Sequence, residues 1–149
     1  MRVMCDTNIL VRAALSPAGS ASELLRLVAL EHVLVTSSVQ LVELLDVLRR
    51  PSIAALHKLD DHGIRRFITR LYKLAVVVPL PALIPQVVPG DPKDNAIVMT
   101  AIAGEAAVLC TLDRHLRIAQ VREHCDRQGV RIRTDAELLA ELRPPPTTT

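Results

Sequence analysis

The chain has 149 residues, half of them hydrophobic, and a formal net charge of +2 at pH 7. This is the size of one ordinary domain, with enough apolar material for a core that needs no covalent staples. The odd number of cysteines, Cys5, Cys110 and Cys125, excludes a closed disulfide framework, and with two aromatic side chains in all, base stacking on aromatic rings is excluded as the main nucleic-acid contact. We expect a reducing, cytoplasmic environment and no membrane span, since no apolar run approaches about 18 residues.

Five short apolar runs predict buried strands at residues 2–5, 33–35, 75–78, 107–110 and 130–132. The segments between them have helical spacing, which predicts helices at residues 21–30, 38–49, 61–74, 93–103 and 136–142. Strands that alternate with helices predict a three-layer α/β sandwich. Its central sheet should be mainly parallel, with about five strands and helices on both faces.

Two proline-rich segments interrupt this pattern. Four prolines between residues 78 and 90 exclude a regular helix there and predict a surface connection within one domain. The tail at residues 144–149, Pro-Pro-Pro-Thr-Thr-Thr, is predicted to be disordered, which leaves residues 1–143 as the folded domain.

Four carboxylates occupy positions that a parallel sheet would bring together. Asp6 follows the first predicted strand, and Asp113 follows the fourth. Residues just past the ends of parallel strands gather along one edge, where open α/β sheets bind ligands. Asp94 opens a predicted helix, and Glu43 lies within another.

Each aspartate also has a structural interpretation. Asp6 could form a turn with its own backbone, and Asp113 could cap a helix beginning near Arg114. Asp91 is the better candidate for a helix cap, because Pro92 follows it at the first helical position. Asp94 could then complete the capping arrangement.

Glu43 lies in a predicted helix that is apolar nearly all round, with Val39 and Val47 four residues to either side. We expect that helix to be largely buried, which makes an unpaired glutamate costly unless it binds a metal or a partner. The alternative is a glutamate that faces solvent between two valines.

Four converging carboxylates repel one another unless a cation lies among them. Carboxylate oxygens select hard ions, so we expect one or two Mg²⁺ or Mn²⁺ ions. Such ions support phosphodiester hydrolysis by activating water. Without the four acids the remaining chain carries +6, which favours a polyanionic substrate.

Four blocks, in this order and spacing, resemble the PIN-domain family, in particular its VapC-like toxin branch. They are residues 3–10 (Val-Met-Cys-Asp-Thr-Asn-Ile-Leu), the helix at 38–48, residues 91–95 (Asp-Pro-Lys-Asp-Asn) and residues 108–113 (Val-Leu-Cys-Thr-Leu-Asp). The segment 129–139 resembles the last strand and helix of the family, so the resemblance extends to Arg143.

The resemblance implies that four acids bind metal and catalyse the reaction, namely Asp6, Glu43, Asp94 and Asp113. It implies that Asn8 and Thr111 are supporting polar contacts, and Lys93 and Arg114 stand beside the acids as candidate phosphate contacts. Two residues depart from the family pattern. Leu112 stands where the family often has glycine, so it could crowd the backbone near the metal, and Cys5 replaces an aliphatic residue.

The function implied by the resemblance is a metal-dependent endoribonuclease that acts as a toxin, bound by a cognate antitoxin and forming a homodimer. The alternative is a catalytically weak or inactive PIN-like module that binds RNA or protein. A phosphoacceptor receiver domain fits poorly, because Asp6 stands alone and Pro79 follows the third predicted strand.

Overall fold

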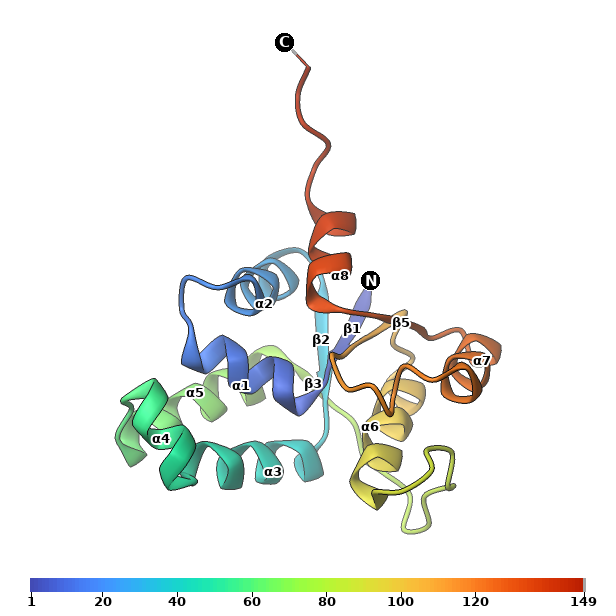
Figure 1. The fold of residues 1–149 in the computed structure, drawn as a ribbon, viewed down its shortest axis with the longest axis horizontal. Helices are drawn as coiled ribbons and strands as arrows, with labels where there is room; N and C mark the ends of the chain where they lie inside the picture. The colour runs from blue at the N-terminus through green and yellow to red at the C-terminus, as the bar shows by residue number, and fades with distance from the viewer. Residues whose placement is uncertain (149) are drawn as a thin grey trace.

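Five parallel strands form the central sheet of the computed structural model, which describes residues 1–148, in the order β3-β2-β1-β4-β5 (Figure 1). The strands are β1 (Arg2–Cys5), β2 (Val33–Thr36), β3 (Val76–Val77), β4 (Val108–Cys110) and β5 (Arg131–Arg133). All five predicted strands are present, and the predicted three-layer α/β architecture is confirmed. Because β1 lies in the centre of the sheet, its residues Val3, Met4 and Cys5 are buried, on whichever face of the sheet they lie.

Helices cover both faces of the sheet. One apolar cluster joins Val3, Cys5 and Val108 to α1 (Thr7–Leu15), α2 (Ser20–Glu31), α3 (Ser38–Arg49), α5 (Asp61–Leu74) and α8 (Asp135–Leu142). The other cluster joins Met4 and Leu109 to α6 (Pro92–Ala103) and α7 (Ala119–Arg127). The period-two alternation of the strands therefore sorts their side chains between two separate cores.

Three helices were not predicted: α1, α4 (Pro51–His57) and α7. Only Asp6, for which a turn was one interpretation, separates β1 from α1, which begins at Thr7. That helix forms because Ile9, Leu10 and Ala13 recur at helical spacing and are buried in the first cluster.

The expectation that α3 is buried nearly all round is wrong. Leu41, Leu44 and Leu48 are buried, whereas Val39 and Val42 are 54% and 61% exposed. The helix covers the sheet with one face only, so its second apolar stripe remains at the surface.

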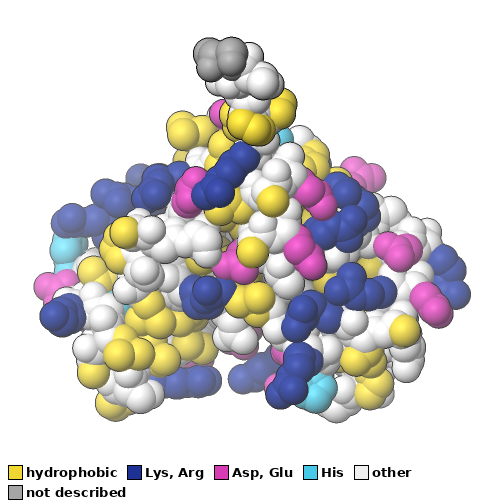
Figure 2. All heavy atoms as spheres, turned by 45° about the horizontal axis from the view of Figure 1, so that its top comes forward, with side chains coloured by type: hydrophobic (Ala, Val, Ile, Leu, Met, Phe, Trp, Pro, Cys, Tyr) yellow, Lys and Arg dark blue, Asp and Glu magenta, His cyan; other side chains and the backbone are white. Residues whose placement is uncertain are grey.

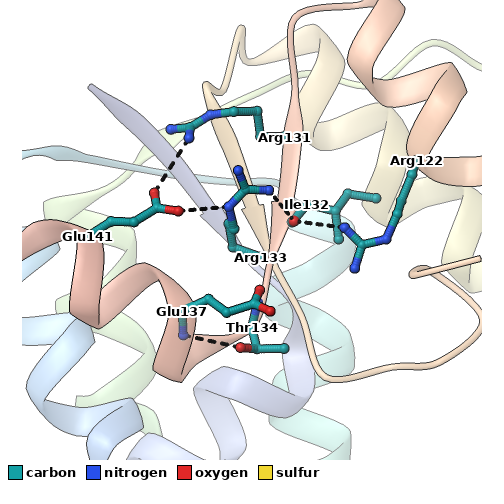
Figure 3. A network of polar contacts seen from close by, with 7 residues as sticks. All are labelled: Arg122, Arg131, Ile132, Arg133, Thr134, Glu137 and Glu141. Carbon is teal, nitrogen blue, oxygen red and sulfur yellow. Dashed lines mark hydrogen bonds and ion pairs between the residues drawn. The ribbon is translucent and has the colours of Figure 1, made fainter.

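The open edge of β5 is covered by arginine side chains (Figure 3). The carbonyl oxygen of Ile132 accepts hydrogen bonds from Nη1 of Arg122, at 3.2 Å, and from Nη1 of Arg133, at 2.9 Å. Arg131 and Arg133 also form ion pairs with Glu141, which ties α8 to the strand. Charged groups on an edge strand oppose pairing with another chain.

The proline-rich connection between residues 78 and 90 lacks helix, as predicted. The connection between β3 and α6 is held by the buried side chain of Asn95, whose Oδ1 accepts hydrogen bonds from the backbone N–H groups of Val87 and Val88. Residues 144–148 are exposed and extend away from α8, and the last residue of the predicted disordered tail, Thr149, lies outside the described residues. Over residues 1–148, no helix is both long and apolar enough to cross a membrane.

Candidate functional site

Asp6 lies at the carboxyl end of β1, in the middle of the sheet, and is only 6% exposed. Its Oδ2 accepts a 2.7 Å hydrogen bond from the hydroxyl of Thr111, and its backbone N–H donates to the carbonyl of Cys110 at 2.8 Å. Asp6 precedes α1, yet its side chain makes no capping hydrogen bond to that helix. The carboxylate is therefore held by Thr111, the residue that follows β4, in addition to a local contact with the backbone of Thr7.

Gln40 fixes the peptide group immediately before Asp6. Its Nε2 donates a 2.6 Å hydrogen bond to the carbonyl oxygen of Cys5, while its Oε1 accepts one from the hydroxyl of Thr36. Gln40 is 1% exposed, so both groups of its amide are buried and both are satisfied. The sequence analysis overlooked Gln40; the signal was a polar residue within the apolar run of α3, one turn before Glu43.

The same buried network reaches α6. The hydroxyl of Thr100 donates to Oγ of Ser37, which in turn accepts from the backbone N–H of Gln40 and caps α3. Buried hydrogen bonds thus join β1, which leads into Asp6, to α3 and α6, which carry Glu43 and Asp94.

Glu43 projects from α3 toward the start of α1. Its Oε2 accepts a 3.1 Å hydrogen bond from the hydroxyl of Thr7, a buried residue that the sequence analysis did not identify as part of the site. Glu43 itself is half-buried. It therefore neither faces open solvent between two valines nor lies deep in a core, and its one protein partner leaves the other carboxylate oxygen available.

Asp94 and Asp113 complete the group, and both are half-buried. Asp91 caps α6 by accepting from the N–H of Lys93, as predicted, which leaves Asp94 in the first helical turn. The N–H of Asp113 donates to the hydroxyl of Thr111, so Thr111 holds two of the four acids.

No helix begins near Arg114, so that part of the prediction for Asp113 is wrong. Asp113 accepts from the N–H of His115, and the chain continues in two tight turns before α7 starts at Ala119. These turns place the side chain of Leu116 in the second apolar cluster. The free energy gained by burying Leu116 exceeds that of a helix capped by Asp113.

The four carboxylates act on one another electrostatically. The pKa of Asp6 is raised from 3.8 to about 6, chiefly by burial and further by the charges of Asp113 and Asp94, against the lowering effect of the Thr111 hydrogen bond. The pKa of Asp94 is also raised, by burial first, then by Asp113 and Asp91, with a smaller contribution from Glu43. The sheet therefore brings together the acids that its topology predicted.

The donor set suits a hard divalent cation, because it consists of carboxylate oxygens, and the charge of Asp113 raises the pKa of both Asp6 and Asp94. Among residues 1–148, no three His, Cys, Asp or Glu side chains are close enough to hold an ion as they are placed. Asp113 is turned toward its own backbone and Glu43 toward Thr7. Holding a cation between three of these carboxylates therefore requires them to lie closer together than they do here.

The remaining predicted contacts are at the surface. Asn8, Lys93 and Arg114 are exposed, and His115 is close enough for its positive charge to oppose the rise in the pKa of Asp94. Leu112 packs against the first apolar cluster, and in the part of the chain described here only Lys58 and Glu105 among non-glycine residues have positive φ. The backbone at Leu112 therefore has no need of glycine.

Comparisons with known proteins agree with this fold. The family model described as "PIN domain" matches residues 2–115. Among solved structures, the chain is similar to one in the crystal structure of VapBC2 from Rickettsia felis bound to a DNA fragment from their promoter, with a TM-score of 0.59 and 19% identity. That similarity covers 90% of this chain and 98% of the other, and at this identity it concerns the fold alone. No curated protein matches the sequence.

Proposed function

Because the chain belongs to the PIN-domain family, we propose that it is a divalent-metal-dependent endoribonuclease and the toxin of a toxin–antitoxin pair. The observation that supports this proposal is that Asp6, Glu43, Asp94 and Asp113 come from separate segments to one edge of the sheet, where burial and the charge of Asp113 raise the pKa of both Asp6 and Asp94. Such a group is costly to maintain for structural reasons alone.

The residues of the proposed site have different roles in binding the metal and the RNA. Thr111 fixes Asp6 as the immobile carboxylate, whereas Glu43, Asp94 and Asp113 can adjust around a bound Mg²⁺ or Mn²⁺ ion. When bound, one or two such ions supply the Lewis acid that activates water and stabilises the charge on the leaving oxygen. The exposed side chains of Lys93 and Arg114 contact the RNA phosphates, and Asn8 adds a neutral polar contact.

The test is cleavage of labelled RNA by the purified protein with Mn²⁺ or Mg²⁺, with and without EDTA. We expect cleavage that EDTA abolishes, and Asp6→Asn and Asp94→Asn variants that fold but do not cut, because each loses one ligand charge while keeping its shape. A folded Asp94→Asn variant that cuts at the full rate contradicts the role proposed for that residue.

One observation favours the alternative of a binding module: within residues 1–148 no three candidate ligands are already close enough to hold an ion. Calorimetric titration with Mn²⁺ separates the two functions. Heat of binding that disappears in Asp6→Asn supports the nuclease; a well-folded wild type that neither binds Mn²⁺ nor cuts diverse RNAs supports the binding module.

A groove between α1, α2 and α5 supports a protein partner, the antitoxin of the proposed pair. Its floor includes Ala13, Leu25 and Phe67, and its rim carries Arg26, Arg66 and Arg70. In residues 1–148, none of these three guanidinium groups forms an ion pair with a carboxylate. Figure 2 shows Lys and Arg side chains gathered on the left flank of the molecule. The occupant that this chemistry favours is an amphipathic segment that carries carboxylates beside an apolar stripe.

A second copy of the chain remains part of the proposal. Exposed apolar side chains gather near edge strand β3, where Tyr72, Leu74 and Val76 follow one another closely and Val33 lies on the neighbouring strand. An exposed apolar patch beside an edge strand is a plausible site of self-association. Light scattering after gel filtration should give the mass of a dimer, and Leu74→Glu should reduce it to that of a monomer.

A further inference from the structure

The outward face of α3 carries a continuous stripe that leads away from the acid site. Val39, Val42, Asp46 and Arg50 are spaced three or four residues apart, with Arg50 just beyond the helix, and Glu43 lies next to Val42 and three residues before Asp46. Residues so spaced lie one above another on a helix. A candidate catalytic acid therefore shares one surface with two exposed valines and an arginine.

These side chains line a hollow of about 230 Å³, which Lys93 of α6 closes from the opposite side. The volume is below the roughly 300–1,000 Å³ of pockets that enclose drug-sized ligands, so it suits a single ring system. Arg50 and Lys93 are exposed, and neither forms an ion pair within residues 1–148. Two cations without ion pairs thus stand beside an apolar wall, in a hollow that Glu43 and Asp46 also line.

We propose that this hollow is a nucleotide subsite: it receives the base next to the scissile phosphate against Val39 and Val42, and the phosphate of that nucleotide on Arg50 and Lys93. The inference rests on the proposed nuclease function and specifies how its substrate lies. Glu43 belongs both to the hollow and to the acid group, so a chain of nucleotides crossing the acids must pass over this surface.

The chemistry of the hollow matches RNA better than a protein partner's segment. A base offers a flat apolar face to the valines, and Asp46 can accept hydrogen bonds from exocyclic amino groups. The chain has one Phe and one Tyr, neither of which lines the hollow, so aliphatic contact replaces the aromatic stacking used by many single-strand binders.

The test compares Val42→Ser with the control variant Leu30→Ser, which changes an exposed apolar residue at the carboxyl end of α2, just before the amino end of β2. With wild-type cleavage established on an RNA of mixed sequence, we expect Val42→Ser to lower kcat/KM about five-fold, through lost apolar contact. Leu30→Ser should match the wild type.

A substrate with an abasic nucleotide next to the cleaved bond makes this test specific. On that substrate the wild type should lose about the same factor, and Val42→Ser should cause no further loss, because the base that it would contact is missing. Equal effects of Val42→Ser on normal and abasic RNA, or no effect on either, would overturn the subsite.

The phosphate contact has its own readout. Binding of noncleaved RNA to a protein already carrying Asp6→Asn should weaken with Arg50→Gln, and the slope of log affinity against log salt should fall by about 0.7. Arg127→Gln, which removes an exposed arginine of α7, is the control and should leave the slope unchanged. The hollow would be assigned to a protein partner by either of two results. One is an unchanged salt slope of RNA binding with Arg50→Gln; the other is that Arg50→Gln loses antitoxin binding without losing RNA binding.

Failure of the subsite and failure of the proposed function remain distinguishable. If the wild type cuts RNA and the variants at Val42 and Arg50 behave like their controls, the nuclease stands and the subsite is wrong. If the wild type cuts no RNA and Asp6→Asn binds none, both proposals are wrong.

Discussion

The side-chain amide of Gln40 donates a 2.6 Å hydrogen bond to the carbonyl of Cys5. Strand β2 ends at Thr36, so the amide supplies the hydrogen bond that a longer β2 would have given to β1. The N–H of the same peptide group, on Asp6, donates to the carbonyl of Cys110 in β4. The peptide group before Asp6 is therefore held from both sides, by α3 and by β4. Asp6 can move little relative to Glu43, which lies one helical turn beyond Gln40.

Replacing Gln40 with Met should weaken the metal site more than the fold. The unbranched side chain keeps most of the volume but cannot donate to Cys5, so the peptide group before Asp6 is freed. Residues that orient metal ligands typically contribute a factor of 10–100 to metal affinity, and we expect about a ten-fold loss of Mn²⁺ affinity by calorimetry.

Ser22→Ala is the matched control, because it removes a buried hydroxyl that donates to carbonyls of Ala13 and Ser16, on α1 and the turn after it. It should destabilise the protein by a similar amount and leave Mn²⁺ affinity unchanged. Hydrogen exchange at the Asp6 amide adds a readout that needs no metal, and should be faster in Gln40→Met only. Equal exchange in both variants would remove Gln40 from this role.

The sequence predicted the sheet and the convergence of the acids because both follow from short-range patterns. Apolar runs mark the strands, parallel connections place their ends at one edge, and Asp6 and Asp113 follow two neighbouring strands. The cap formed by Asp91 was also predictable, since Pro92 after an aspartate has a single favourable place in a helix.

The contacts that position the acids were not predictable, because they join residues far apart in the chain. Nothing near Gln40 indicates that its amide reaches Cys5, 35 residues earlier, and nothing near Thr7 indicates Glu43. The exposure of Val39 was missed for a related reason: periodicity identifies apolar faces but does not say which of two a sheet will cover.

Asp6 should make the metal-free protein less stable as the pH rises. Its pKa is about 6 in the fold against 3.8 ordinarily, so its stabilising contribution is fully present below about pH 3.8 and is lost as pH rises through 6. The shift corresponds to about 2–3 kcal/mol. In EDTA at neutral pH, Asp6→Asn should therefore resist urea better than wild type; an equal or lower stability, with the same pH dependence, would contradict the burial of a charged Asp6.

Thr111→Val should shift the acid limb of the RNA-cleavage pH profile to higher pH. The Thr111 hydroxyl lowers the pKa of Asp6 by donating to its carboxylate, and valine has the same shape without the donor. Asp6 then keeps its proton to a higher pH, and the active ionised form appears later. Thr69→Val, at an exposed position on α5, is the control, and an acid limb that stays in place for both variants would show that Asp6 does not govern it.

Charge reversal in the groove between α1, α2 and α5 should weaken binding of the antitoxin. Arg66 shares a hydrogen bond with His62, and within residues 1–148 neither Arg66 nor Arg70 forms an ion pair with a carboxylate, so neither reversal breaks one. We expect Arg66→Glu or Arg70→Glu to reduce affinity at least ten-fold by calorimetry, with greater loss at low salt. Arg127→Glu should bind as the wild type does; full affinity in both groove variants would place the partner elsewhere.

Leu112→Gly tests whether the departure from the family's usual glycine impairs the enzyme. Leu112 packs against the first apolar cluster and lies outside the positive-φ region, so glycine would remove apolar contact and add backbone freedom without relieving any strain. We expect a loss of about 2 kcal/mol in the free energy of unfolding, measured in urea, and no gain in the rate of RNA cleavage. Leu112→Ala, which keeps the backbone restricted, should show a smaller loss. A glycine variant that cuts RNA faster than the wild type at equal stability would mean that the leucine side chain does obstruct the acids. The apolar packing of Leu112 would then lower the rate of RNA cleavage.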